Sequence, residues 1–273
     1  MKSPMLLGCL SLLHAAAQHA AVHTAARTAA RTASASASHT SQEQGHFPFE
    51  GYLKRLQTFE AGKAHPGDAA SSVSGIGSHL SRLKPFVSWF ERWLRDHSVE
   101  SLVEASCGHW PSGWQPSVRW PPLAYTGIDI MDEMVEANRE FFKTRNASSQ
   151  GTFGLSSHHF QSSDLVAKVL PRADVLLTKD TIMHIPNNAI QSFLRRSVTV
   201  CPPRFKHVIF VGGYEAGGVN ADTTPQTTYH NLDMAKPPFG LNVSLALRFA
   251  GSKADHRLSR VVQVYDTARN CVM

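Results

Sequence analysis

Two acidic residues stand at positions where carboxylates can hold a sugar. The stretch VEASCGHWPSGWQ covers residues 103–115, where a short apolar run ends at Glu104 and turns through Gly108. Asp129 ends the next apolar run, 21 residues after Gly108. This spacing is typical of a carboxylate that accepts hydrogen bonds from both hydroxyls of a ribose. The structural alternative is that Asp129 caps the following helix, although Asp132 is better placed to do so.

The glycines of a dinucleotide-binding loop are missing. Between the two apolar runs only Gly108 and Gly113 occur, and G-x-G-x-x-G is absent. Without it, nothing brings backbone amides close around a pyrophosphate. A nucleoside that carries no phosphate needs fewer amides. The pattern therefore favours S-adenosyl-L-methionine (SAM) over NAD, and an NAD-dependent dehydrogenase ranks well below.

Short apolar runs predict the strands that position these residues. The runs alternate with segments of helical periodicity as far as Tyr214, and two further runs follow each other without a helix between them. We expect strands at Ser101–Ala105, Ala124–Ile130, His158–Phe160, Ala173–Asp180, His207–Tyr214, Leu245–Ala250 and Arg260–Asp266. The last two should pair as a hairpin.

Three segments carry apolar residues at helical spacing. One begins at Leu80, one near Asp132, and one includes Ile190 and Val198. Alternating strands and helices predict a Rossmann-like, doubly wound α/β fold with a mostly parallel, seven-stranded sheet. The closing hairpin adds one antiparallel strand. In such sheets ligands bind beyond the carboxyl ends of the strands.

The ordered set of motifs resembles a class I SAM-dependent methyltransferase. More narrowly, the chain is similar to a group whose first loop reads like CGDWQ. The resemblance covers roughly Gly75 to Phe239 and rests on VEASCGHW, YTGIDIMDEMVEANREFF, SSDL, DVLLTKDTIMHIPN and NLDMAKPPFGL. The first motif alone is weakly specific, whereas the set in this order is much more so.

The resemblance implies cofactor-binding roles by position. Near the methionine part of SAM it places Glu104 and the turn Ser106-Cys107-Gly108, and at the ribose and adenine it places Asp129, Ile130, Asp164 and Leu165. Lys179 would lie near the sulfonium. The segment Gly75–Ser78 resembles the loop that precedes the first helix and folds over the cofactor. Asp164 is equally well placed to cap a helix starting at Leu165, and Lys179 can be an ordinary surface charge.

Methyl transfer needs alignment of the acceptor, and a base where the acceptor holds a proton. Asp180 and His184 follow a strand end and are the candidate bases, although His184 is as readily a structural histidine. Tyr214, His230 and Asp233 are candidates for the acceptor pocket. A small molecule is the expected acceptor.

Two positions depart from the resembling group. His109 stands where the group has an acid, and the turn begins Glu-Ala-Ser rather than Asp-x-Gly. Ser106 lacks the backbone freedom of glycine. These departures motivate a second hypothesis, a methyltransferase-like binding protein without turnover. Trp110 and Trp114 are expected to pack over the cleft, and no metal site is expected.

Residues 1–45 predict a targeting segment, and residues 46–273 the methyltransferase domain. An apolar stretch from Met5 to Leu13 follows Lys2 and is too short to span a bilayer. The Ala-, Ser-, Thr- and Arg-rich segment after it suits an organelle transit peptide. In series they suit a plastid reached through the secretory route, with a mitochondrion or secretion as alternatives.

The charge distribution bears on possible partners, and the cysteines bear on possible disulfides. The net charge is +6, and the first 42 positions contribute three basic residues and no acidic one to it. The rest shows no basic cluster with interleaved aromatics, so a nucleic-acid partner is not indicated. Of four cysteines, Cys9 lies in the targeting segment, and the remaining Cys107, Cys201 and Cys271 predict no disulfide framework.

Overall fold

The computed structural model describes residues 72–148, 151–215, 217–223, 229–250 and 259–271. All of them belong to the compact unit Phe47–Met273. The segment 1–45 lies outside the described residues, so its targeting role stays a prediction. Among the described helices, none is both long and apolar enough to cross a membrane.

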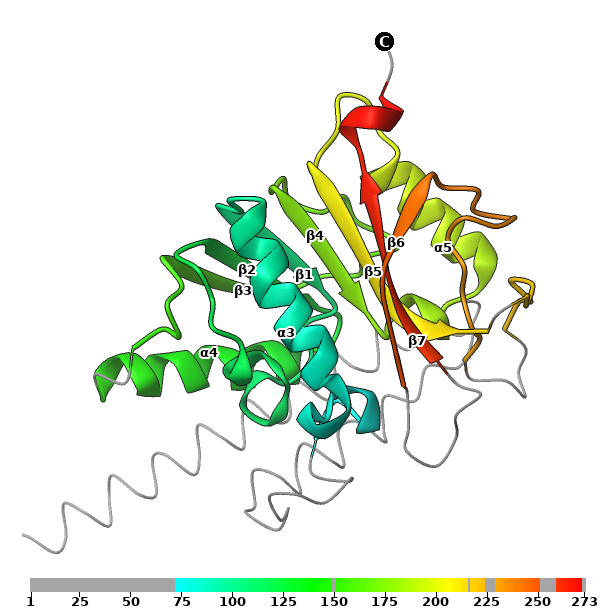
Figure 1. Cartoon of the computed structure of the whole chain (residues 1–273). Helices are drawn as coiled ribbons and strands as arrows, with labels where there is room; N and C mark the ends of the chain where they lie inside the picture. The colour runs from blue at the N-terminus through cyan, green and yellow to red at the C-terminus, as the bar shows by residue number, and fades with distance from the viewer. Residues whose placement is uncertain (1–71, 149–150, 216, 224–228, 251–258, 272–273) are drawn as a thin grey trace, which may run out of the picture. The chain divides into compact units, whose positions relative to one another are not determined.

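Seven strands form one sheet in the order β3-β2-β1-β4-β5-β7-β6 (Figure 1). The strands are β1 Ser101–Ala105, β2 Ala124–Asp129, β3 Ser157–Ser162, β4 Val175–Lys179, β5 His207–Tyr214, β6 Val243–Ala250 and β7 Ser259–Asp266. The neighbours from β3 to β5 pair in parallel. β7 runs antiparallel to both β5 and β6. The predicted sheet with its closing hairpin is confirmed.

Helices cover both faces of this sheet. The helices α3 Leu80–Asp96 and α4 Asp132–Ala147 share a core with Leu102, Leu177 and Ile209 on one face. The helix α5 Asn187–Phe193, continued by π-helical residues Leu194–Val198, packs on the other face against Val103, Leu176 and Val208. Alternate residues of each strand thus point into different cores, which explains why the strands read as continuous apolar runs.

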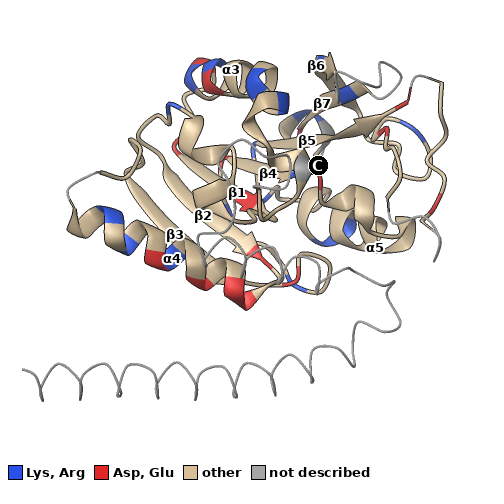
Figure 2. Ribbon diagram, turned by 90° about the horizontal axis from the view of Figure 1, so that it is seen from below, with Lys and Arg blue, Asp and Glu red and all other residues tan. Residues whose placement is uncertain are grey.

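Charge is ordered along α4. Asp132 and Glu133 lie in its first turn and Arg145 in its last. Figure 2 shows the acidic residues gathered toward the start of this helix and the basic ones toward its end. This arrangement complements the helix dipole and helps α4 to begin directly after β2.

Two connections between strands contain no α-helix, including the one after Asp164, where a helix starting at Leu165 was the alternative. The segment after Asp164 makes only a turn over residues 165–168, and no helix follows it. Between β1 and β2 the chain forms two short 3-10 turns, Trp110–Ser112 and Gln115–Ser117, and no α-helix. Pro111 and Pro116 lie within these turns, where each removes a backbone donor that a longer helix would use.

The expectation of no disulfide is wrong for one pair. Cys201 is bonded to Cys271, with the two Cα atoms 5.9 Å apart and a sequence separation of 70. Cys201 precedes β5 and Cys271 follows β7, and the antiparallel register places His207 opposite Asp266. The start of one strand therefore meets the end of the other. Cysteine spacing cannot show this, because the contact arises from strand pairing.

Candidate functional site

The carboxyl ends of β1, β2 and β4 converge on one cleft. Glu104, Asp129 and Lys179 line it from these three adjacent strands. The turn after β1 and the segment around Ser74 and Ser78 complete the lining. The cavity encloses about 80 Å³, which is small beside the several hundred Å³ of common ligand sites. A nucleoside would therefore need these walls to move apart.

Asp129 faces the cleft with its carboxylate already oriented. One oxygen accepts the Gly108 amide at 2.9 Å, and the other accepts the Met131 amide at 3.1 Å. Burial raises the pKa of Asp129, and these amide hydrogen bonds oppose the rise. Each carboxylate oxygen can accept two hydrogen bonds. Two acceptor sites thus remain for a ligand, and α4 begins without a side-chain cap hydrogen bond at its N-cap residue Met131.

Gly108 makes the turn after β1 possible. Its φ of +62° lies in the left-handed region, where only glycine is free of steric cost. An added Cβ would also meet the Ser74 hydroxyl at 2.3 Å. The same hydroxyl accepts the His109 amide at 2.7 Å. Ser74 and the turn are therefore locked together at the mouth of the cleft.

Glu104 is held at the end of β1 by two donors. The Tyr125 hydroxyl donates to it at 2.6 Å, and the Gln115 amide nitrogen at 3.1 Å. The Tyr125 hydroxyl in turn accepts the indole N–H of Trp110 at 2.9 Å. Burial raises the pKa of Glu104 to about 8, although Tyr125, Lys179 and Gln115 favour the ionised form. The carboxyl is therefore poised to ionise when a cationic group arrives.

The candidate base Asp180 lies between two cations. It bonds to Lys179 Nζ at 2.8 Å and to the Arg260 guanidinium. Burial opposes ionisation of Asp180, but Lys179 and Arg260 outweigh it and hold its pKa below the usual value. A carboxylate stabilised in this way is a weak proton acceptor. Asp180 thus fits a positioning role better than that of a base.

His184, the other candidate base, also lies at the cleft. It ends the short turn Ile182–His184 after β4 and belongs to the lining. Its ring lies 6.5 Å from that of Tyr229. Thr181, beside it, accepts the Ser106 amide at 3.5 Å and so ties this turn to the end of β1. Its role as a base stays a prediction.

The remaining predicted residues divide between the cleft and the core. Ser106, Cys107, Gly108 and Ile130 line the cleft, as do Trp114 and Met134. Burial raises the pKa of the Cys107 thiol well above its usual value, so it stays protonated. Trp110 and Trp114 are both buried in the aromatic core, but the expectation that both pack over the cleft holds only for Trp114, since Trp110 is not part of the lining.

Five predicted residues do not line the cleft. Asp164 accepts the amides of Val166 and Ala167 and caps a turn, while Leu165 packs in the core. Tyr214 lies under Arg248. His230 faces the carbonyls of Ala221 and Ile185, and Asp233 accepts from Gln263 and Ala235. The polar side chains of Asp164, His230 and Asp233 instead hold loops in place.

His109 also points away from the cleft. It is buried, its Nδ1 lies 2.8 Å from the Ser112 hydroxyl, and that hydroxyl accepts the Val73 amide at 3.0 Å. Burial lowers the pKa of His109 to about 4. The buried surroundings of His109 therefore disfavour a charged side chain. Through the Ser112 hydroxyl, His109 joins residue 73 to the turn after β1.

We expect His109→Asp to lower the free energy of unfolding by about 2–4 kcal/mol, because it buries a carboxylate without a cation. Affinity for the cofactor should not improve. Urea denaturation measures the first effect and calorimetry the second. His109→Gln, which can still bond to Ser112, is the matched control. A stable Asp variant with tenfold tighter binding would contradict this account.

Three residues of the site escaped sequence reasoning. Arg260 comes from β7, and Gln115 and Tyr125 support Glu104. Tyr125 is the second residue of the predicted strand and lies on the same face as Glu104, so strand periodicity could have indicated it. Within the described residues, no group of acids, histidines and cysteines could hold a metal ion.

No known protein family and no curated protein matches this sequence. Solved structures do. Magnesium protoporphyrin IX methyltransferase (ChlM) from Synechocystis PCC 6803 with bound SAM is 14% identical over 77% of this chain and 89% of its own, with a TM-score of 0.48. The small RNA methyltransferase HEN1 is 12% identical over 71% of this chain and 26% of its own, with a TM-score of 0.50. The DhpI–SAH complex is 13% identical over 78% and 97%, with a TM-score of 0.45.

Identities this low establish likeness of fold alone. The chain has a Rossmann-like α/β fold of the kind found in methyltransferases. A fold does not determine a substrate, so the substrate must be argued from the site.

Proposed function

We propose that this chain binds SAM in the cleft and transfers its methyl group to a small-molecule acceptor. The observation that carries the proposal is the pair of buried carboxyls, Glu104 and Asp129, which end adjacent strands and line one cleft. One suits the cationic methionine end of the cofactor. The other has acceptor capacity left for two ribose hydroxyls.

The chain's own residues would orient the cofactor rather than activate it. SAM supplies a methyl group on a good leaving group. Asp129 would fix the ribose, and Ile130, 43% exposed, offers an apolar surface to the adenine. Glu104 would hold the ammonium group, and Lys179 and Asp180 would shape the floor near the sulfonium. The acceptor would enter past Thr181 and His184, where His184 can take a proton.

Calorimetry with SAM and with its demethylated product, S-adenosylhomocysteine, tests the proposal. We expect saturable one-to-one binding of both, since the proposed contacts exclude the methyl group itself. A folded sample that gives no heat with either ligand would refute it.

The alternative is a methyltransferase-like binding protein without turnover. Its motive is the turn after β1, where Ser106 and His109 depart from the resembling group. Incubation with methyl-labelled SAM and a fractionated metabolite extract separates the two. Transfer of label to an extract component supports the enzyme, whereas tight cofactor binding with no transfer in any fraction supports the binding protein.

We propose that the first 45 residues direct the chain to an organelle or into the secretory pathway. The Cys201–Cys271 bond supports passage through an oxidising compartment, where disulfides persist. Sequencing the N-terminus of the mature protein tests this. A mature chain that begins at Met1 would contradict it.

A further inference from the structure

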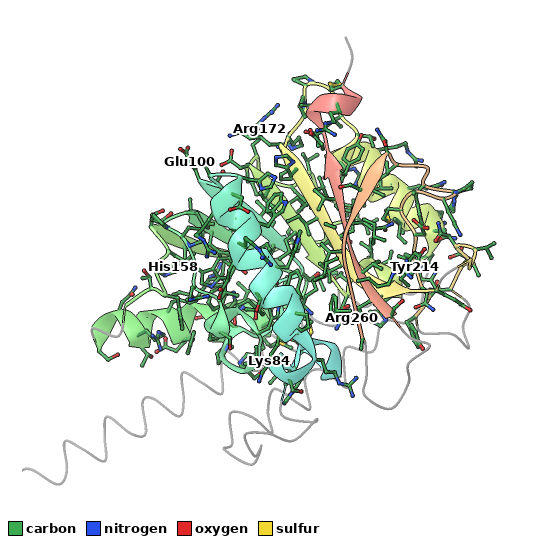
Figure 3. The ribbon with its side chains drawn as sticks, viewed as in Figure 1. Lys84, Glu100, His158, Arg172, Tyr214 and Arg260 are labelled. Atoms are coloured by element: carbon green, nitrogen blue, oxygen red, sulfur yellow. A yellow bond between two sulfur atoms is a disulfide. The ribbon has the colours of Figure 1, made fainter. Side chains whose placement is uncertain are left out.

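A buried polar cluster joins three distant parts of the chain beside the cleft. Lys179 ends β4 and Asp180 follows it, Arg260 is the second residue of β7, and Gly77 precedes α3. Lys179 Nζ lies 2.8 Å from Asp180 and 3.3 Å from the Gly77 carbonyl oxygen. Arg260 donates to the same carbonyl at 3.1 Å and to Asp180. Figure 3 shows Arg260 at the end of the sheet opposite to Arg172.

The hydrogen bonds of the cluster satisfy both of its buried cations, Lys179 and Arg260. The side chain of Lys179 is 3% exposed and that of Arg260 is 9% exposed. Buried cations are costly unless they are paired and hydrogen-bonded. Here each of them has the same two acceptors, a carboxylate and one carbonyl. The guanidinium fork suits this, because two of its nitrogens bond to different groups in a fixed geometry.

Gly77 is needed for the close approach. A Cβ at this position would lie 2.9 Å from a carboxylate oxygen of Asp180. The Gly77 carbonyl can accept from both cations only because this residue has no side chain. Asp180 itself has a φ of +57°, which turns its carboxylate toward this carbonyl rather than along the strand.

The bonded segment forms one wall of the cleft. Ser78, next to Gly77, lines the cavity together with Lys179 and Asp180. The amide of Ser78 is bonded within this segment, to the Gly75 carbonyl, and the amide of Gly75 is bonded to the Ser72 carbonyl just before it. These local bonds shape the segment without using its contacts to Lys179 and Arg260. Because the cavity encloses about 80 Å³, a nucleoside can enter only after this wall lifts.

We propose that Arg260 is a positioning residue of the cofactor cleft, and that its bonds to Gly77 and Asp180 close the segment Gly75–Ser78 over the bound nucleoside. The inference rests on the proposed SAM-binding function. Arg260 touches no cofactor atom in this account. It acts through the Gly77 carbonyl, and its contribution is retention of the ligand.

Arg260→Met keeps the length of the side chain and removes the charge. We expect S-adenosylhomocysteine to dissociate roughly 10- to 100-fold faster, as for loss of a charge-assisted hydrogen bond. Hydrogen exchange at the amides of Gly75 and Ser78 should quicken even without ligand. Arg260→Lys should recover part of both effects. Arg172→Met, which removes a 2.8 Å bond to the Pro203 carbonyl at the other end of the sheet, is the matched control.

Gly77→Ala is a second, independent variant that still tests the proposal if Arg260→Met does not fold. It leaves every charge in place and pushes the segment from Asp180, so we expect the same faster exchange and dissociation. Gly212→Ala is its control, since a Cβ there meets nothing within 4 Å.

Unchanged exchange at Gly75 and Ser78 in both variants, with dissociation within twofold of the wild type, would overturn the proposal. A merely structural role would lower stability without this local change. If the wild type binds no ligand, the proposed function fails, while the ligand-free exchange still tests the closure.

Discussion

Replacing Asp129 with alanine is expected to weaken binding of S-adenosylhomocysteine by at least about 100-fold. The substitution removes the proposed hydrogen bonds to both ribose hydroxyls, and each bond to a charged group contributes about 1.5–3 kcal/mol. It also leaves the amides of Gly108 and Met131, which donate to Asp129 in the wild type, without this acceptor. The turn after β1 then loses its anchor. Calorimetry against the wild type measures the effect.

Asp132→Ala is the matched control for this loss. Asp132 is an exposed acid in the first turn of α4, three residues away. It should leave affinity unchanged, while Asp129→Asn should bind with intermediate strength because one acceptor oxygen remains. Wild-type affinity in the Asp129→Ala variant would show that the ribose is held elsewhere.

Cofactor affinity should rise with pH because of Glu104. Its pKa is about 8 in the folded protein, so the carboxyl is largely protonated at neutral pH. A cationic ammonium group binds better to the ionised form. Affinity should therefore increase by up to about tenfold per pH unit between about pH 5.5 and 7.5, and level off as pH passes the folded pKa.

The same shift sets the sign of the stability change. A raised pKa means that the folded state binds the proton more tightly than the unfolded chain. The stabilisation from protonated Glu104 is complete below the unfolded pKa of 4.5 and is lost as pH rises toward about 8. Ligand-free protein should thus lose stability over the range in which affinity grows.

Glu104→Gln separates this effect from other titrations. The amide can still accept from the Tyr125 hydroxyl, which donates to Glu104 at 2.6 Å, but it cannot ionise. Its binding should be weak, and the slope of affinity against pH should flatten. A variant that keeps the full wild-type slope would assign the pH dependence to another group.

The strands and the charged residues at their ends could be predicted, because an apolar run and the charge that ends it are local signals in the sequence. Glu104, Asp129 and Lys179 each end a buried run, and parallel strands bring such ends together. The cleft therefore follows from local pattern plus topology. The roles of its residues in binding SAM remain predictions.

Arg260 could not be predicted because its partners are set by long-range pairing. It begins an apolar run and looks like the polar boundary of a strand. Only the insertion of β7 between β5 and β6 brings it to Asp180, 80 residues earlier in sequence. The Cys201–Cys271 bond escaped for the same reason.

His109 shows where a resemblance misleads. Its alignment with an acid suggested a weakened cofactor site. In the structure the left-handed Gly108 precedes it, and its ring lies against Ser112. The direction of a side chain depends on backbone dihedral angles, which sequence similarity does not record. The substitution gives no reason to expect lost binding.

The central claim is that Asp129 holds the sugar of SAM. A crystal structure of the chain with S-adenosylhomocysteine tests it most directly. The account predicts both ribose hydroxyls within hydrogen-bonding distance of the Asp129 carboxylate, and the segment Gly75–Ser78 closed over the nucleoside. A ligand bound elsewhere, or a ribose that leaves Asp129 on its two backbone amides alone, would contradict it.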